Sequence, residues 1–221
     1  MNELIFLLHC LAVLIFMLGA VRLGKDALVA FVSASWLFAN FFVTKQIMLF
    51  GFEVTASDVY AIGGMLGVSL IQEFFGKTQA IRSVWISFFI LAFAALTSFM
   101  HINYIPSPSD TMHGHFAQVL GSTPRLITVS FITFFISGRL DIILFGFLQR
   151  STNLSFALRS GISTCLVMLI DTALFTTLGL SGIVGSLLDV FLLSYLVKLF
   201  VVFILIPFLT LVPPAHDTVS L

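Results

Sequence analysis

Long apolar runs alternate with short polar junctions along almost the whole chain. A bilayer core about 30 Å thick needs about 20 mostly apolar residues per helix. Seven runs approach or reach that length between clusters of charged residues, glycine or proline. We therefore predict an all-α fold, a polytopic bundle of about seven transmembrane helices, at about residues 4–21, 27–44, 57–75, 83–101, 125–147, 160–179 and 183–211.

The third run is the least apolar and the richest in glycine. It reads SDVYAIGGMLGVSLIQEFFG, with Gly63, Gly64 and Gly67 close together. Small residues at this spacing suit either close packing between helices or a locally broken helix beside a cavity. We predict packing, with the broken helix as the alternative.

Composition agrees with a membrane protein of one domain over residues 1–221. Hydrophobic residues make up 59% of the chain and charged residues 9%, and the mean hydropathy is +1.15. A soluble domain carries about 25% charged residues, so a soluble fold is excluded. The formal charge is zero without a basic cluster, which gives no sign of a nucleic-acid partner. Membrane lipid is the expected surrounding.

Basic residues occur in alternate loops between the predicted helices. Lysine and arginine in short loops are retained on the cytoplasmic side of a membrane. The loops after the first, third and fifth helices contain Arg22, Lys25, Lys77, Arg82, Arg150 and Arg159. This pattern predicts an N-terminus outside and a C-terminus inside. The loop at 101–124 is then external, either as a lid or as a solvated connector, and we favour the connector.

Two ionisable residues lie near the middle of predicted helices. An ionisable group at that depth costs about 2.5–3.5 kcal/mol on insertion scales, so it should face the interior of the bundle and have a partner. Asp171 lies in the sixth helix, with Thr164 on the same helical face, and Lys198 lies at similar depth in the seventh. We predict an ion pair between Asp171 and Lys198, which serves either a functional site or only the register of the two helices.

Further polar residues occur nearer the helix ends. Arg139 and Asp141 point about 200° apart on the fifth helix, so they cannot share one narrow face. Glu73, at the inner end of the third helix, is the predicted partner of Arg139. Asn40 and Lys45 end the second helix and are expected at the external mouth, although Lys45 would also suit simple snorkelling.

Motifs for catalysis and metal binding are missing from the sequence. The chain has no P-loop, nucleophile elbow, HExxH or CxxC motif, so we predict no enzyme activity and no cofactor. His101, His113 and His115 have poor spacing for metal ligands, so no metal is expected. Transport of a small polar solute remains the favoured function.

Four stretches and one lysine carry a resemblance to a known family. They are Asn40 with Lys45 and Phe50-Gly51, then LIQEFFGK with Glu73, then SFITFFISGRLDIILFGFLQR with Asp141, then LRSGISTCLVMLIDTALF with Arg159, Ser163, Thr164, Asp171 and Thr172, and finally Lys198. In this order they resemble the queuosine precursor transporter family, also called the vitamin uptake transporter family. The resemblance covers residues 38–211. It implies a family-like core of six helices at 27–211 and an extra N-terminal helix at 1–24.

The resemblance implies import of a 7-deazaguanine base across a bacterial inner membrane. The base would be 7-cyano-7-deazaguanine, 7-aminomethyl-7-deazaguanine or queuine. On this interpretation Asp171 accepts hydrogen bonds from the ring, and Glu73 and Asp141 are further anchors or coupling groups. Asn40 and Lys45 would guard the outer entrance.

The chain also departs from the family pattern at three positions. Ser69 replaces an aspartate of the family, and Gly138 and Met168 replace glutamines. Fewer amide and carboxylate groups imply an altered choice of substrate rather than a loss of transport. Arg139, next to one of the lost glutamines, could donate to a ring carbonyl instead.

Three other functions stay open at this point. The chain could be the substrate-binding membrane subunit of an energy-coupling-factor vitamin system with a separate ATPase. It could also be a membrane enzyme or assembly factor that uses Asp171 and Lys198, or a structural scaffold. The substrate, the driving ion, any energising partner and assembly into a homo-oligomer are left open by the sequence.

Overall fold

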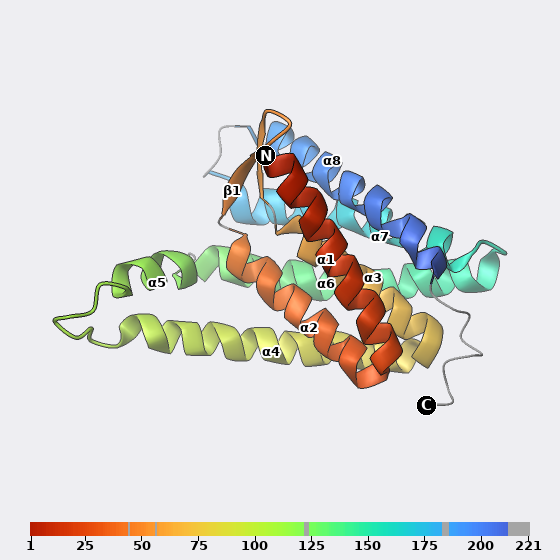
Figure 1. Cartoon of the computed structure of the whole chain (residues 1–221), viewed down its shortest axis with the longest axis horizontal. Helices are drawn as coiled ribbons and strands as arrows, with labels where there is room; N and C mark the ends of the chain where they lie inside the picture. The colour runs from red at the N-terminus through yellow and green to blue at the C-terminus, as the bar shows by residue number, and fades with distance from the viewer. Residues whose placement is uncertain (44, 56, 122–123, 183–185, 212–221) are drawn as a thin grey trace.

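Helices make up most of the computed structural model, which describes residues 1–43, 45–55, 57–121, 124–182 and 186–211 (Figure 1). Seven long helices and one short helix lie within these ranges. They are α1 (Asn2–Leu23), α2 (Lys25–Phe42), α3 (Asp58–Phe75), α4 (Lys77–Asn103), α5 (His113–Leu120), α6 (Pro124–Ser151), α7 (Phe156–Leu174) and α8 (Leu187–Leu205). The predicted all-α bundle of about seven helices is confirmed.

Within the described ranges, five helical segments are long and apolar enough to cross a membrane, which makes the chain a multi-pass membrane protein. They are Asn2–Leu23, Lys77–Asn103, Thr128–Ser151, Phe156–Gly179 and Leu187–Leu209. The other two long helices, α2 and α3, have 18 residues each and carry charged residues within that length. The predicted start of the last helix, at 183–185, lies outside the described residues.

Helix α3 forms the centre of the bundle and packs against α1, α2, α4, α6, α7 and α8. It is continuous, and its glycines meet the neighbouring helices closely. A Cβ on Gly63 would lie 2.6 Å from Cγ1 of Val13 in α1, and a Cβ on Gly67 would lie 2.6 Å from Cγ2 of Val32 in α2. The glycines therefore allow close packing between helices, as predicted, and the alternative of a broken helix is wrong.

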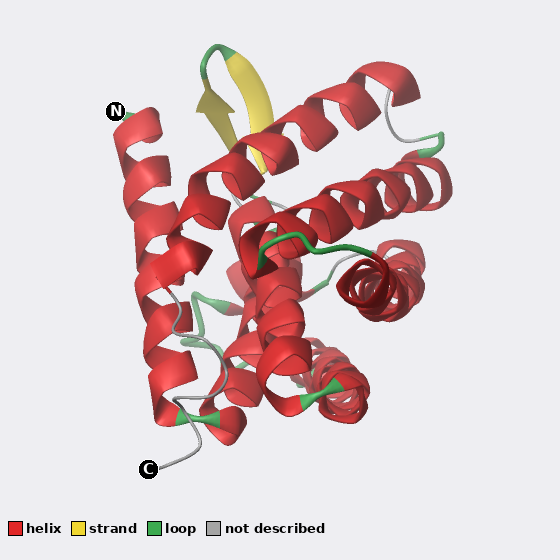
Figure 2. Ribbon diagram, turned by 90° about the vertical axis from the view of Figure 1, so that its right-hand side faces the viewer, coloured by secondary structure: helices red, strands yellow, loops and turns green. Residues whose placement is uncertain are grey.

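A β-hairpin between α2 and α3 was not predicted. Strands β1 (Gln46–Leu49) and β2 (Phe52–Thr55) are antiparallel, and Leu49 pairs with Phe52. The two-residue turn has positive φ at both Phe50 (52°) and Gly51 (86°), which is the backbone of a type I′ turn. The side chain of Asn2 donates a hydrogen bond to the backbone oxygen of Met48 at 2.9 Å. The hairpin therefore lies beside the N-terminus, as Figure 2 shows.

The segment between α4 and α6 contains the short helix α5. The carboxylate of Asp110 accepts hydrogen bonds from the backbone N–H groups of Met112 (2.7 Å) and His113 (3.2 Å) at the start of this helix. Val119 and Leu120, at its end, line the main cavity of the bundle. No residue of α5 is buried, so the segment is a largely exposed connector, as the sequence favoured, that contains one short helix.

Candidate functional site

A cavity of about 690 Å³ lies in the half of the bundle nearer the hairpin. Its walls come from α2, α3, α4, α6, α7 and α8, with contributions from the hairpin and α5. A volume of this size is typical of sites for small molecules, which span about 300–1,000 Å³.

Five aromatic side chains contribute to the cavity wall. Trp36, Phe41, Phe131, Phe134 and Phe175 line it. The rings of Trp36 and Phe134 meet edge to face, with centroids 4.5 Å apart and planes at 64°. Phe175 belongs to a π-helical turn, Phe175–Gly179, that continues α7. Such rings offer a flat apolar surface on which a planar ring system can stack.

The charged part of the cavity wall is a cluster around Lys198. Its ammonium donates a hydrogen bond to Oδ2 of Asp171 at 2.9 Å and another to Oγ1 of Thr172 at 3.0 Å. The same nitrogen lies 3.8 Å from Oδ1 of Asp58, in the first turn of α3. Ser137 of α6 donates to the second oxygen of Asp171 at 3.0 Å. The predicted ion pair between Asp171 and Lys198 is confirmed, and Asp58 is a third member that the sequence analysis missed.

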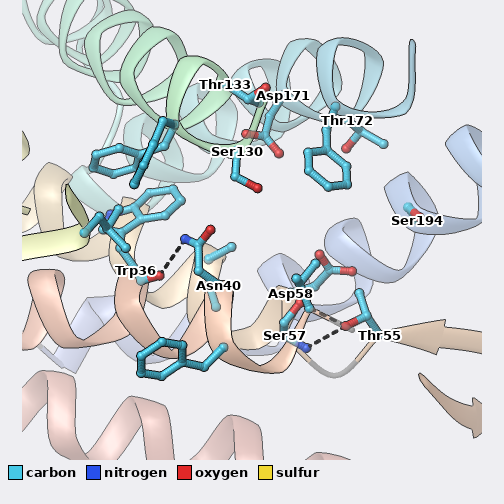
Figure 3. Close-up of a pocket in the computed structure, with 18 of the residues that line it drawn as sticks. Trp36, Asn40, Thr55, Ser57, Asp58, Ser130, Thr133, Asp171, Thr172 and Ser194 are labelled. Atoms are coloured by element: carbon cyan, nitrogen blue, oxygen red, sulfur yellow. Dashed lines mark hydrogen bonds between the residues drawn. The ribbon is translucent and has the colours of Figure 1, made fainter. Parts of the chain in front are cut away.

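Polar groups from α2, α3, α6 and α7 surround the open space in this cavity (Figure 3). Asp171 and Thr133 lie on one side of it, and Asp58 lies across from them. Asn40 comes from α2, where its amide donates to the backbone oxygen of Trp36 at 3.0 Å. The hydroxyl of Thr133 is buried and has no hydrogen-bond partner among the described residues. A ligand in the cavity would meet both donors and acceptors.

A further buried carboxylate, Asp141, lies deeper in the bundle and does not line the cavity. Ser163 donates to its Oδ1 at 2.6 Å, and Ser69 donates to its Oδ2 at 3.3 Å. These three side chains come from α6, α7 and α3 and are fully buried. They fill the interior between the cavity and the far end of the bundle.

Glu73 lies at that far end and pairs with Arg159 rather than with Arg139. The guanidinium of Arg159 donates to Oε1 of Glu73 at 2.7 Å, and the amide of Gln149 donates to Oε2 at 3.0 Å. The predicted pairing of Glu73 with Arg139 is therefore wrong. These contacts join α3, α6 and α7 on the side away from the cavity, and we call the three residues Glu73, Gln149 and Arg159 the end latch.

The remaining predicted site residues lie outside the cavity wall. Lys45 is exposed, next to Gln46, which lines the cavity, so Lys45 lies near its rim. Arg139 is half-buried on α6 and does not line the cavity. Thr164 is buried in α7, and its hydroxyl has no hydrogen-bond partner among the described residues. Of the predicted site residues, Asn40, Asp171 and Lys198 line the cavity.

Comparison with known proteins gives one family and one curated relative. Residues 55–212 match the family described as "Putative vitamin uptake transporter". Over 206 residues the chain is 27% identical to a protein of Bacillus subtilis (strain 168) described as "Probable queuosine precursor transporter", and the match covers 91% of this chain and 89% of the relative. No solved structure matches the chain. Asp58, Asp171 and Lys198 all lie within the family match.

Proposed function

We propose that this chain, which belongs to the putative vitamin uptake transporter family, carries a queuosine precursor or a related 7-deazaguanine base across a membrane. The observation that carries the proposal is the cavity, which combines aromatic rings with a charged and polar wall inside a multi-pass helical bundle. A deazaguanine has a flat apolar ring and an edge with both donors and acceptors. The cavity offers complementary groups for each part.

The ring edge is the part of the base that the polar wall would recognise. Asp171 is held by Ser137 and Lys198, so its carboxylate has a fixed position at the cavity. A carboxylate oxygen can accept more than one hydrogen bond. Asp171 then accepts from the ring N–H and amine groups, while Thr133 and Asn40 contribute to the remaining polar contacts. The aromatic residues hold the ring by stacking.

The position of the basic loops supports import from outside. Lys25 and Arg82, from two of these loops, line the same small cleft, and Arg159 from the third takes part in the end latch. The basic loops therefore gather at the end away from the cavity. If basic loops face the cytoplasm, the N-terminus is outside and the cavity lies toward the exterior. A base would then bind from the outside, with the layer around Asp141 and the end latch closing the inner side.

Uptake of labelled 7-deazaguanines by bacteria that lack their own carrier tests the proposal. Cells that produce this chain should accumulate at least one of the three bases. Asp171→Asn should reduce that uptake at least about tenfold, because a charged hydrogen-bond acceptor is worth about 1.5–3 kcal/mol. Asp189→Asn is the matched control, since Asp189 is exposed at the start of α8, and it should leave uptake unchanged.

Three results would count against a stand-alone carrier. No uptake of any of these bases by cells in which the protein is inserted would reject the substrate class. Uptake into liposomes that appears only after an ATPase subunit is added would assign the chain to an energy-coupling-factor system instead. Chemically changed substrate in liposomes that contain the purified chain alone would indicate a membrane enzyme.

A further inference from the structure

The ionisable residues of the cavity wall carry one more negative charge than positive. Among the residues that line it, the ionisable side chains are Asp58, Asp171 and Lys198. Lys198 is bonded to Asp171 and to Thr172, so its charge is matched mainly by Asp171. A buried charge without a partner is unfavourable. The second carboxylate, on Asp58, therefore lacks a cation of its own.

The geometry around Asp58 agrees with this charge count. Its Oδ1 lies 3.8 Å from the Lys198 ammonium, too far for a hydrogen bond, and its Oδ2 has no hydrogen-bond partner among the described residues. The side chain is 9% exposed. In Figure 3 its carboxylate points toward Asp171 across the cavity. An unpartnered buried carboxylate at a cavity is an acceptor ready for a positively charged donor.

We propose that Asp58 binds the protonated amine of a cationic substrate, so that the cavity selects an aminomethyl-substituted deazaguanine over its uncharged cyano analogue. This inference rests on the proposed function and adds to it the charge of the substrate. Aliphatic amines such as the lysine side chain are protonated at neutral pH. The bound ammonium brings the charge of the cavity wall and its ligand to zero, with Asp171 left to recognise the ring.

An organic ammonium suits this position better than a divalent metal ion. A calcium ion takes six to eight oxygen ligands, and magnesium requires nearly octahedral geometry. Here a single carboxylate is unpartnered, and the nearby hydroxyls of Thr55 and Ser57 are bonded to each other at 2.9 Å. No group of three or more histidine, cysteine or acidic residues that could hold a metal occurs in the part of the chain that the structure describes. An ammonium has only three donors to satisfy.

A direct test compares uptake of labelled 7-aminomethyl-7-deazaguanine and 7-cyano-7-deazaguanine by the same cells. The wild-type chain should take up the amine at least about tenfold more efficiently, which corresponds to about 1.4 kcal/mol. Asp58→Asn keeps the shape of the side chain and removes its charge, so the ratio of amine to cyano uptake should fall at least tenfold. Asp189→Asn changes an exposed aspartate in the same way and should leave the ratio as in wild type.

The outcomes separate this inference from the function on which it rests. Equal uptake of the two bases, or a preference for the cyano base, would overturn the role of Asp58 while transport stands. A ratio of amine to cyano uptake that is the same in Asp58→Asn as in wild type would also overturn the role of Asp58. Uptake of neither base, nor of queuine, by the inserted protein would reject the proposed function itself.

A free cation is the other possible source of the positive charge. The same uptake is measured with sodium replaced by choline. If uptake of the cyano base needs sodium and loses that need in Asp58→Asn, the carboxylate serves a co-transported ion, and the inference is overturned. Amine uptake that is independent of sodium and sensitive to Asp58→Asn supports it.

Discussion

Lys198 is the one cation for two carboxylates among the described residues that line the cavity, so replacing it should have a larger effect than replacing either carboxylate. Lys198→Met keeps most of the length of the side chain and leaves Asp58 and Asp171 buried without their counter-charge. Asp58→Asn leaves the pair of Lys198 and Asp171 intact. The three variants should therefore differ in stability. Lys198→Met should be the least stable, Asp171→Asn intermediate and Asp58→Asn the most stable.

The distances set the size of these effects. An attraction between unit charges at 4 Å is worth about 4 kcal/mol in surroundings of effective dielectric constant 20, before desolvation is counted. Lys198→Met loses two such attractions, and removal of one member of a buried pair costs about 3–5 kcal/mol net. Asp171→Asn loses a charged hydrogen bond, worth about 1.5–3 kcal/mol. Asp58→Asn loses an attraction without a hydrogen bond, but it also removes the desolvation cost of a buried carboxylate, so we expect a net cost of at most about 1 kcal/mol.

Thermal unfolding of the detergent-purified protein measures this order. Cys10 is a free thiol with no exposed surface, so a fluorogenic maleimide should label it only as the bundle opens. Cys165→Ala removes the half-buried second thiol from the background. For a chain of this size about 1 kcal/mol shifts the melting temperature by about 2–4 °C. Lys198→Met should then melt about 6–20 °C lower, and Asp58→Asn at most about 4 °C lower.

Equal destabilisation by Asp58→Asn and Lys198→Met would refute the reasoning. It would mean that Asp58 is as firmly paired with Lys198 as Asp171 is, and that the cavity wall has no unmatched carboxylate. A double variant, Lys198→Met with Asp171→Asn, adds an internal check. It should be more stable than Lys198→Met alone, because it removes one of the two buried carboxylates that Lys198→Met leaves unpaired.

Two further predictions concern positions outside the cavity. Gly67→Ala should destabilise the bundle by about 1–3 kcal/mol, because its Cβ would lie 2.6 Å from a valine methyl of α2. The control is Gly19→Ala, which has open space around it and should be neutral in the same melting assay. Ser163→Ala removes the closest hydrogen-bond donor to Asp141 and should lower the free energy of unfolding by about 1.5–3 kcal/mol. The control is Ser160→Ala, which removes a buried hydroxyl that has no partner in the described part of the chain and should cause no measurable loss of stability.

The helices and the central ion pair could be predicted because both depend on local pattern. Each long helix contains an apolar run, and Asp171 and Lys198 interrupt two such runs near mid-depth, where a charge needs a partner. Asp58 was missed because it stands in the first turn of α3, where an acidic residue is ordinary in any helix. The packing of α3 beside α7 and α8 makes it part of the cavity.

The partner of Glu73 and the hairpin depend on features that one sequence does not specify. Glu73 and Arg159 are 86 positions apart, and their pairing depends on how α3 and α7 are rotated about their axes. The hairpin has strands of only four residues, and its turn places Phe50, a residue that rarely adopts positive φ, next to Gly51. Neither strand alternates apolar and polar residues for long enough to be recognised.

The central position of α3 has a consequence for how the chain enters a membrane. This helix is not among the segments that are apolar enough to cross a membrane, and most of its residues are buried by other helices. The helices that cover its glycine-rich face, α1 and α2, precede it in the chain and are synthesised first. They can therefore receive α3 as it leaves the translocation machinery. Variants that enlarge Gly63 or Gly67 should lower the amount of protein that reaches the membrane before they alter what it carries there.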